Sequence, residues 1–449
     1  MADDLISTAL ERAPDTDDVL IGPGALGSVG EVVRRVVGDR PVTVVADEVT
    51  WRVAGKQVQE QLDASGATAG EAFLFPAGTF VRADYANVEK VRDALAARDA
   101  IPVAVGSGSL NDLVKRAAHE LDRRYVVVAT AASMDGYTAF GAALTRDGYK
   151  QTMTCPAPLA LVADLDVLAA APAAMTASGY GDLLGKVTAG ADWLVADALG
   201  VEPIDATVWS LVQGPLRDAV GRPAELAAGD PAALGGLVEG LVMSGLAMQA
   251  HASSRPASGA EHQFSHLWEM EGLGADQRPP LSHGFKVGIG SIAVAALYER
   301  LLDRDLGDID VDALAAAWPT ADQVTRDVEA VHSIDGVRTA AVAESLAKHV
   351  GPEQLAERLE LVRTRWPELR ERLVGQLLPA AELAEMLRAA GAPSRPADIG
   401  VSAETLRDTY YRCRTIRRRY TVLDLAAETG LLEPCVEELF APGGFWSQG

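Results

Sequence analysis

The feature that most constrains the fold is a regular alternation of β-branched runs and helical stretches between residues 18 and about 165. DVLIGPG, PVTVVADE, IPVAVGSGS and YVVVATAAS have the composition of buried strands, and LGSVGEVVRRVVG and LNDLVKRAAHELD carry apolar residues at helical spacing. Strands that alternate with helices form a parallel sheet covered by helices, because a parallel connection must cross over the sheet. The alternation therefore predicts an α/β domain over residues 1–170.

Beyond about residue 170 the β-branched runs stop, and Ala-rich and Leu-rich segments with polar faces continue to the C-terminus. The clearest helices are APAAMTASGYGDLLGK, AALGGLVEGLVMSGLAM, GIGSIAVAALYERLL and PEQLAERLELVRTRW, while DPAALGG and SSRPASGA have the composition of connections. A length of 449 residues suits two domains. The sequence thus predicts an all-α second domain over residues 171–449.

Charge and composition exclude several classes of function. The formal net charge is −23, which repels nucleic acid and anionic lipid; the basic run at 412–420 is interpreted as a charged helical face. Three cysteines, Cys155, Cys413 and Cys435, offer neither a disulfide framework nor metal-finger spacing. The N-terminus lacks the blocks of a secretion signal, and we expect no apolar run long enough to span a bilayer. We therefore expect a cytoplasmic protein without nucleic-acid or integral-membrane partners.

The segment GSGSLNDLVK (106–115) follows a predicted strand and opens a predicted helix. Its backbone amides and helix N-terminus could cradle a pyrophosphate, and its glycines allow close approach. Gly-Ser turns after strands are common, and the G-x-G-x-x-G fingerprint is absent from the first strand-helix turn, which reads GPGALG. The candidate cofactor-binding residues of this segment are Gly106, Ser107, Gly108, Ser109 and Asp112.

Asp47 closes the strand PVTVVAD and lies 23 residues after Gly24, where nucleotide folds place an acid that binds the adenine ribose. A carboxylate there disfavours a 2′-phosphate, so we expect NAD as cofactor, with NADP as the alternative. A helix cap is the other interpretation of Asp47.

The run TAASMDGYTAFGAAL (130–144) sets small and hydroxyl-bearing residues beside an aspartate at the end of a buried strand. Thr130, Ser133 and Asp135 could face the ligand. A plain turn explains Ser-x-Asp-Gly but not the small, polar residues before it.

Four of the seven histidines fall between residues 251 and 283. His262 and His266 are four apart, so on a helix both project from one face, and His283 follows in LSHGFKVGIG. Zinc and related metals take neutral imidazoles together with a carboxylate, leaving an open position for chemistry. Asp182, which we expect to begin a helix in ASGYGDLLGK, is the candidate carboxylate, with a first-turn acid as the alternative. A single histidine here would more often be a packed core residue.

Together these segments resemble the glycerol-1-phosphate dehydrogenases of the dehydroquinate synthase-like and iron-containing alcohol dehydrogenase superfamily. The resemblance rests on GSGSLNDLVK, TAASMDGYTAFGAAL, GYGDLLGK, SSRPASGAEHQFSHLWEM, LSHGFKVGIG and RRRYTVLDLA, which occur in this order between about residues 20 and 430. It implies an N-terminal dinucleotide-binding domain, a helical metal- and substrate-binding domain, and a substrate site between them.

The resemblance also implies roles for single residues. Asp182, His262 and His283 would hold one divalent metal, and His266 would orient the substrate or pass a proton. Lys186 stands where the iron-dependent branch has a fourth ligand, a histidine, so zinc or nickel is expected rather than iron. The segment at residues 106–109 would bind the pyrophosphate, and Asp47 would contact the ribose. Thr130, Ser133 and Asp135 would line the nicotinamide and substrate region, where Asp135 would have a catalytic role.

The implied reaction is the interconversion of dihydroxyacetone phosphate and sn-glycerol 1-phosphate with NADH or NAD, the metal acting as a Lewis acid on the ketone oxygen. A small phosphorylated three-carbon substrate needs cations in an acidic protein, and Lys186, Arg255 and Lys286 are the candidates, with structural ion pairs as the alternative. Three other functions stay open: a dehydrogenase of another small polyol or sugar phosphate, a dehydroquinate synthase-like cyclase (a lyase) that uses NAD transiently, and a binding or scaffold protein that keeps the metal for stability. We expect a homo-oligomer.

Overall fold

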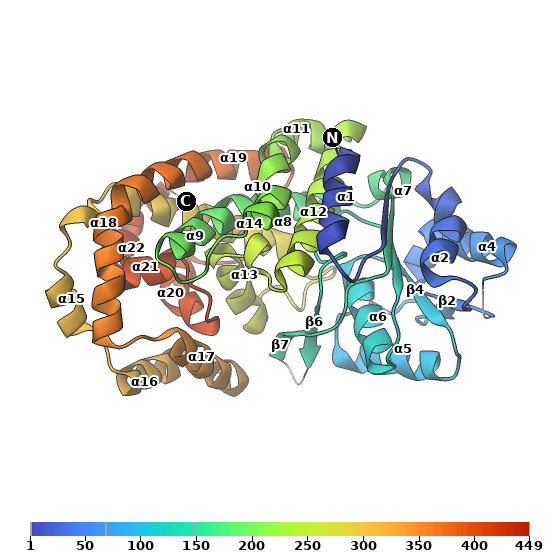
Figure 1. Ribbon diagram of the computed structural model, residues 1–449, viewed down its shortest axis with the longest axis horizontal. Coiled ribbons are helices and arrows are strands. Elements are labelled where there is room, and N and C mark those ends of the chain that lie inside the picture. The colour runs from blue at the N-terminus through green and yellow to red at the C-terminus, as the bar shows by residue number, and fades with distance from the viewer. Residues whose placement is uncertain (1, 68–69, 147–148, 449) are drawn as a thin grey trace. The chain divides into compact units, whose positions relative to one another are not determined.

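The computed structural model describes residues 2–67, 70–146 and 149–448. Its backbone contacts divide the chain into two compact units (Figure 1). The sheet unit comprises Met1–Leu183 and Thr207–Ser254, and the helical unit comprises Leu184–Ala206 and Arg255–Gly449. The strands end before residue 170, as expected, but the helical stretch 207–254 groups with the sheet unit. A functional boundary at residue 170 stays a prediction.

The sheet unit is built on a parallel sheet of six strands in the order β1-β8-β5-β4-β2-β3. The strands are β1 (Asp18–Gly22), β2 (Val42–Ala46), β3 (Phe73–Leu74), β4 (Ile101–Gly106), β5 (Val126–Ala129) and β8 (Ala160–Asp164). A separate antiparallel hairpin pairs β6 (Ala142–Arg146) with β7 (Tyr149–Met153). The four strands that the sequence predicts are confirmed as β1, β2, β4 and β5, and the α/β class is confirmed with them.

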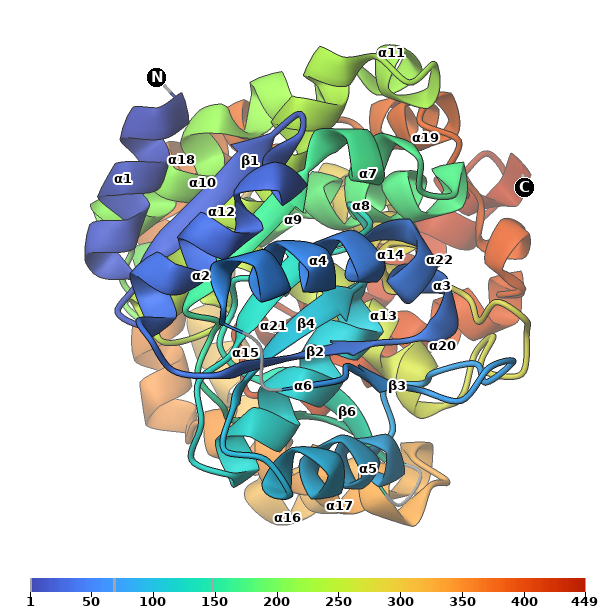
Figure 2. The same cartoon turned by 90° about the vertical axis from the view of Figure 1, so that its right-hand side faces the viewer.

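Every residue of β2, β4, β5 and β8 is buried, which is expected when helices cover both faces of a parallel sheet. Valines of α2 and apolar residues of α4 pack on one face with alternate residues of these strands. Figure 2 shows α2 and α4 on one side of β2 and β4, with α5 and α6 on the other. Successive side chains of each strand therefore point alternately into the two cores on either face of the sheet.

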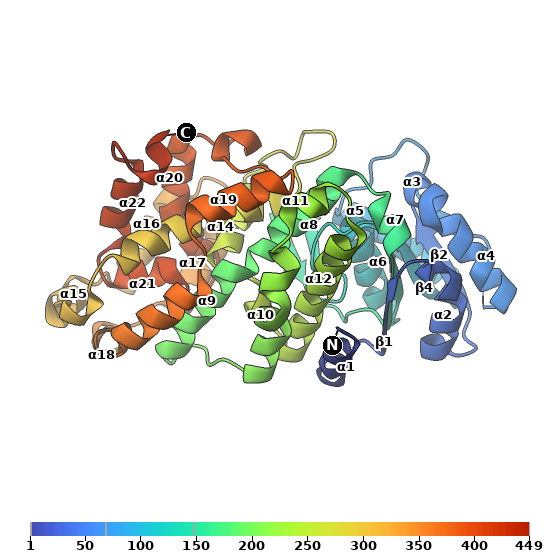
Figure 3. The same ribbon diagram turned by 90° about the horizontal axis from the view of Figure 1, so that it is seen from above.

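The sheet unit also contains eleven helices among the residues that the structure describes, including a helical layer formed by α8, α10 and α12. Gly236 and Gly240 of α12 lie against Ala219 of α10, and Gly240 also meets Leu183 of α8, as Figure 3 shows for the three helices. The helices are α1 (Ala2–Arg12), α2 (Val29–Val37), α3 (Glu48–Thr50), α4 (Lys56–Ser65), α5 (Tyr85–Ala96), α6 (Gly108–Glu120), α7 (Leu165–Ala169), α8 (Ala173–Leu184), α10 (Ala206–Val220), α11 (Pro223–Ala227) and α12 (Pro231–His251).

One of these helices, α12, is long and apolar enough to cross a membrane, so the expectation that the chain has no apolar run of that length is wrong. However, 72% of its apolar window is buried inside the protein. Burial of this kind is typical of the core helix of a globular unit.

As predicted, the described residues of the helical unit form helices and the connections between them, with no strand. Within it, α13 and α14 pack against each other, and Gly290 of α14 lies against the backbone of Glu261. Its helices are α9 (Lys186–Ala198), α13 (Ala260–Met270), α14 (His283–Leu302), α15 (Val311–Ala317), α16 (Ala321–Val331), α17 (Asp335–Lys348), α18 (Pro352–Gln376), α19 (Ala380–Ala389), α20 (Ala403–Arg412), α21 (Val422–Glu428) and α22 (Leu432–Phe440).

Three local expectations are wrong. The basic run at residues 412–420 is no helical face, because α20 ends at Arg412 and residues 417–420 lie in no helix. The segment DPAALGG is no connection but the start of α12, because Asp230 caps the helix by accepting from the Ala233 amide and Pro231 suits its first turn. Asp182 does not begin a helix: α8 starts at Ala173 and holds Asp182 in its last turn. Gly179 lies inside this helix, where a Cβ would collide with the Ala132 carbonyl.

The close approach of α12 to the loop after β5 makes a matched pair of substitutions informative. A Cβ at Gly245 would lie 2.8 Å from the Asp135 carbonyl oxygen and would also collide with the Thr138 hydroxyl. Gly245→Ala should therefore destabilise the protein by about 1–3 kcal/mol, the usual cost of overpacking. Gly235→Ala in the same helix, whose nearest neighbour would be 3.9 Å away, should be neutral or stabilising by up to about 1 kcal/mol. Denaturant unfolding of both variants measures this, and equal effects would contradict the close approach.

Candidate metal centre and cofactor-binding loops

The candidate cofactor-binding segments lie together at one edge of the sheet. The register pairs Val45 of β2 with Ala104 of β4, and Gly106 of β4 with Ala129 of β5, so the turns after these three neighbouring strands begin side by side. The Thr130 amide donates to the Gly106 carbonyl at 3.1 Å. Asp47, Gly106 and Thr130 thus occupy the edge where open α/β sheets bind ligands.

The turn after β4 leads directly into α6. Ser107 is the N-cap in an extended conformation, and its side chain makes no capping hydrogen bond. A Cβ at Gly106 would lie 2.5 Å from Leu110, and one at Gly108 would lie 2.7 Å from Met134, so both glycines are required by packing within the protein. Ser107 is half-buried and Ser109 is exposed, which leaves the first turn of the helix accessible.

Asp47 caps a short helix. Its carboxylate accepts from the Thr50 amide at 2.8 Å, and the Thr50 hydroxyl accepts from the Asp47 amide at 3.1 Å, which completes a capping box. The capping interpretation is therefore confirmed. The ribose contact stays a prediction, and one carboxylate can serve both because it has two oxygens.

The loop after β5 is anchored to α6 by a buried lysine that sequence reasoning did not single out. Lys115 Nζ donates to the carbonyls of Gly136 (3.0 Å), Ala139 (2.8 Å) and Gly141 (3.0 Å). Burial lowers the pKa of Lys115, opposed by the charge of Asp112. Asp112 lies 3.9 Å from this ammonium and accepts from the Ala143 amide at 3.1 Å. A cofactor-binding role for Asp112 stays a prediction beside this structural one.

The anchored loop reaches the candidate metal ligand Asp182. The Asp135 amide donates to Asp182 Oδ2 at 3.0 Å, and the Asp135 carboxylate accepts from the Ser244 hydroxyl at 2.8 Å. The Ser133 carbonyl accepts from Ser178 of α8 at 3.1 Å. A backbone amide therefore orients the buried carboxylate of Asp182.

His262 and His266 lie one turn apart on α13, as their spacing predicts, with ring centroids 5.8 Å apart. The start of α13 is held by the buried carboxylate of Asp192, which accepts from the Ala260 amide at 2.7 Å and from the Tyr298 hydroxyl at 2.6 Å. Burial, and then the nearby Glu261 charge, raise the pKa of Asp192 to about 7. Asp192 fixes where the helix begins and hence where its histidines lie.

A buried carboxylate orients His262. Its Nδ1 lies 2.8 Å from Glu261 Oε1, and Glu261 also accepts from the Thr188 hydroxyl and the Gly259 amide. Burial alone would raise the pKa of Glu261, but the hydrogen bonds from His262 and Gly259 outweigh it and hold the pKa below its usual value. An ionised carboxylate can only accept, so Nδ1 carries the proton and Nε2 keeps its lone pair.

His283 is oriented in the same way from the first residue of α14. Its Nδ1 lies 3.0 Å from Glu269 Oε1 and 3.3 Å from the Ser265 hydroxyl. The ring centroids of His262 and His283 are 5.3 Å apart. Both imidazoles therefore present Nε2, the nitrogen that a metal would take.

Asp182, His262 and His283 each offer a ligand atom, and these atoms lie within 4.8 Å of one another. Asp182 stands two residues before the end of α8, whose last residue, Leu184, already belongs to the helical unit. Two imidazoles held by carboxylates and one carboxylate held by an amide form a donor set that fits a divalent metal. The residues that the sequence proposed as ligands are thus brought together, and three ligands leave coordination positions open.

His266 is the third imidazole of this group and is no member of the ligand cluster. Its ring stacks on that of His283, with centroids 5.9 Å apart and planes at 23°. Burial, and then the guanidinium of Arg417, hold the pKa of His266 well below its usual range. The imidazole is therefore neutral near pH 7.

The three proposed cations are buried. Arg255 donates to the carbonyls of Asp192 and Tyr420 and lies 3.4 Å from Glu202. Lys286 Nζ donates to the Leu281 carbonyl at 2.9 Å and lies 3.6 Å from Glu269. These contacts favour the structural alternative for both residues. Lys186 is fully buried as the first residue of α9, and its phosphate role also stays a prediction.

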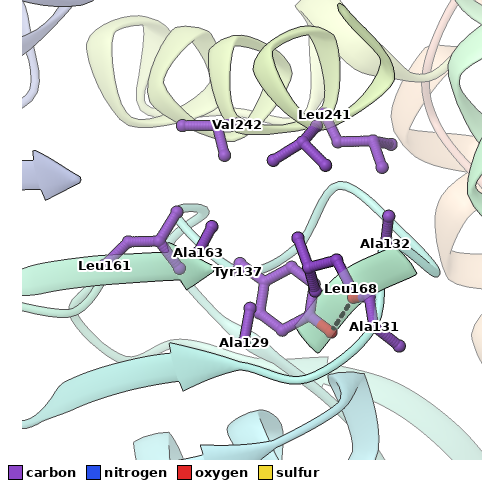
Figure 4. Close-up of a pocket in the computed structure, with 10 residues that line it drawn as sticks. Ala129, Ala131, Ala132, Tyr137, Leu161, Ala163, Leu168, Leu241 and Val242 are labelled. Atoms are coloured by element: carbon purple, nitrogen blue, oxygen red, sulfur yellow. Dashed lines mark hydrogen bonds between the residues drawn. The ribbon is translucent and has the colours of Figure 1, made fainter. Parts of the chain in front are cut away.

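The sheet unit also contains a small apolar pocket, lined by Ala129, Ala131, Tyr137, Leu241 and other small or aliphatic residues (Figure 4). The Tyr137 hydroxyl, a polar side-chain atom of the lining, already donates to the Ala131 carbonyl at 2.7 Å. With no charged side chain in its lining, this pocket suits neither a pyrophosphate nor a metal.

Sequence reasoning missed Glu261, Glu269, Lys115 and Asp192. Glu261 stands next to His262 in AEHQFSHLWEM, and Glu269 follows His266 by three residues, so both acids were visible beside the metal motif. Lys115 and Asp192 carried no comparable signal. Charged residues in helices are usually solvated, and only the fold buries these two.

Comparisons with known proteins agree with this geometry. The sequence profile of the iron-containing alcohol dehydrogenases matches residues 20–172. A glycerol-1-phosphate dehydrogenase [NAD(P)+] from Halalkalibacterium halodurans is 37% identical over 287 residues, which cover 64% of this chain and 71% of the relative. Its namesake from Bacillus subtilis is 31% identical over 420 residues, covering 93% and 92%. Among solved structures, glycerol dehydrogenase from Schizosaccharomyces pombe shares the fold with a TM-score of 0.60 at 15% identity, covering 95% and 91%.

The buried carboxylates make a testable contribution to the metal centre. Glu261→Gln keeps the shape but loses the charge that orients His262, so affinity for zinc should fall by roughly 10–100-fold, as for other residues that hold a ligating histidine. Titration with zinc against a competing chelator measures this. Glu271→Gln, which removes a carboxylate one residue beyond α13, is the control and should bind zinc like the wild type. Unchanged affinity in the Glu261 variant would contradict the orienting role.

Proposed function

Because the chain belongs to the glycerol-1-phosphate dehydrogenase family, within the iron-containing alcohol dehydrogenases, we propose that it interconverts dihydroxyacetone phosphate and sn-glycerol 1-phosphate with NAD(P) and one divalent metal. The observation that carries the proposal is the cluster of Asp182, His262 and His283, in which each ligating histidine is oriented by a carboxylate. The substrate follows the names of the relatives at 31% and 37% identity.

The cofactor would bind at the carboxyl edge of the sheet. The first turn of α6 offers amides to the pyrophosphate at Gly106, Ser107, Gly108 and Ser109. Asp47 would accept from a ribose hydroxyl, which favours NAD over NADP. Thr130, Ser133 and Asp135 follow the neighbouring strand and are the candidates for the nicotinamide side. The bound nicotinamide supplies or accepts the hydride.

Asp182, His262 and His283 would hold the metal, with zinc or nickel as the candidates because Lys186 replaces a fourth histidine ligand. A bound divalent ion would supply Lewis-acid polarisation of the carbonyl oxygen. Glu261 and Glu269 keep the two imidazoles in the ligating tautomer, and the Asp135 amide keeps the carboxylate in place.

His266 is the candidate proton carrier. Arg417 donates toward its Nδ1, so the neutral ring bears its proton on Nε2 and would orient the substrate by donating a hydrogen bond to an oxygen; passing a proton would require Nδ1 to take up another. The ring lies beside both ligating histidines, which limits the distance that a proton must travel. One carboxylate oxygen of Asp135 accepts from Ser244, and the other could serve the catalytic role that we propose for this residue.

Metal dependence is the first test. Purified protein should oxidise NADH with dihydroxyacetone phosphate, lose this activity on chelation and regain it with zinc or nickel. His262→Ala and His283→Ala should each lower kcat/KM at least about 100-fold, since a Lewis acid contributes several kcal/mol. His119→Ala, on the exposed face of α6, is the control. A lyase of this fold would consume substrate without net change in NADH, and activity of the chelated protein equal to the untreated protein would refute the proposal.

Cofactor preference is the second test. Asp47→Asn keeps an oxygen that can cap α3 but removes the charge that would repel a 2′-phosphate. The ratio of KM for NADPH to KM for NADH should fall by roughly 10-fold, because like charges at a binding site cost one or more kcal/mol. Steady-state kinetics with both cofactors measure the ratio. A wild type that already prefers NADPH would remove Asp47 from the ribose site.

A further inference from the structure

One arginine beside the histidine cluster, Arg417, forms no ion pair within 4 Å in the part of the chain that the structure describes, although its charge acts on the more distant Glu344. In the basic run, Arg412 pairs with Glu271, Arg414 lies 3.7 Å from Asp424, and Arg418 pairs with Glu344 at 2.6 Å. Arg417 differs: in the part of the chain that the structure describes, no carboxylate oxygen lies within 4 Å of its guanidinium. Its two contacts are the Ile416 carbonyl at 3.0 Å and His266 Nδ1 at 3.5 Å.

The lack of an ion pair is unusual at the position that Arg417 occupies. The side chain is half-buried, and His266, which it touches, stacks on the ligating His283 and lies one turn from the ligating His262. All four residues belong to the helical unit, so their arrangement does not depend on the sheet unit. A permanent positive charge without an ion pair next to the histidine cluster raises the local potential, which attracts an anion that enters the site.

The chemistry of the side chain indicates which anion. A guanidinium keeps its charge at any relevant pH and presents a planar fork of donors that matches phosphate. At least one edge of the fork is free to turn toward a ligand, because Nη1 and Nη2 each make a single contact. Arg255 and Lys286, the cations next to the sequence motifs, are already bound to carbonyls and carboxylates.

We propose that Arg417 binds the phosphate group of the substrate and so makes the site selective for a phosphorylated ketone over its unphosphorylated analogue. The proposal rests on the proposed function and names the cation that this function requires. An acidic protein with a net charge of −23 needs such a local cation to attract a dianion.

Kinetics of matched variants test the proposal. Arg417→Ala should raise KM for dihydroxyacetone phosphate by roughly 10–100-fold, as expected for loss of a hydrogen bond to a charged group, while KM for NADH changes less than about 3-fold and kcat/KM for dihydroxyacetone falls far less than kcat/KM for dihydroxyacetone phosphate. The KM of Arg417→Lys for dihydroxyacetone phosphate should lie between those of the wild type and Arg417→Ala, because lysine keeps the charge but lacks the planar fork of donors. Arg418→Ala, which removes the adjacent arginine that pairs with Glu344, is the control and should behave like the wild type.

Binding of inorganic phosphate gives a readout that needs no turnover. Phosphate should raise the melting temperature of the wild type and of Arg418→Ala, and leave that of Arg417→Ala unchanged. Equal kinetic losses for both ketones, or an undiminished phosphate shift in Arg417→Ala, would overturn the phosphate role. A wild type that is stabilised by phosphate through Arg417 but reduces no dihydroxyacetone phosphate would instead refute the proposed function.

Discussion

Two hydrogen bonds in the helical unit, from His262 to Glu261 and from His283 to Glu269, determine what the histidine cluster can do. Each favours a proton on Nδ1 and leaves the lone pair of Nε2 available to a metal. Without them, the two imidazoles could adopt either tautomer and either ring orientation. The carboxylates in turn need the fold, because a buried charge is tolerated only when other donors satisfy it. Thr188 and the Gly259 amide do this for Glu261.

In the sheet unit, the loop after β5 links the candidate cofactor-binding turn before α6 to Asp182, a candidate metal ligand. Lys115 of α6 donates to three carbonyls of this loop, and the Asp135 amide donates to the Asp182 carboxylate. A lysine buried in this way loses hydration of its ammonium, and three carbonyl dipoles replace it. The helix α6 therefore helps to position the loop that holds Asp182.

The cations around the site differ in whether contacts within the fold already neutralise their charge. Arg255 is buried and bound to the carbonyls of two helical-unit segments, which it joins, and Lys286 supports Glu269. Arg417 is half-buried, touches His266 and has no carboxylate at hand in the described residues. A charge already neutralised in the fold stabilises that fold, whereas a charge left without an anion is available to a ligand. Proximity to a motif in the sequence does not distinguish these cases.

The sequence by itself determined the α/β class, four of the six sheet strands, and the spacing of His262 and His266 on one helix, which follow from local periodicity and can be recognised without knowing the fold. The candidate metal ligands were visible as rare residue types, but the choice of Asp182, His262 and His283 came from the resemblance to a known family. Only the tertiary structure decided that Asp182 ends a helix rather than begins one, that stretch 207–254 groups with the sheet, and which charges are satisfied. Those outcomes depend on contacts between residues more than a hundred positions apart, such as Ser244 with Asp135, and such contacts leave no trace in local composition.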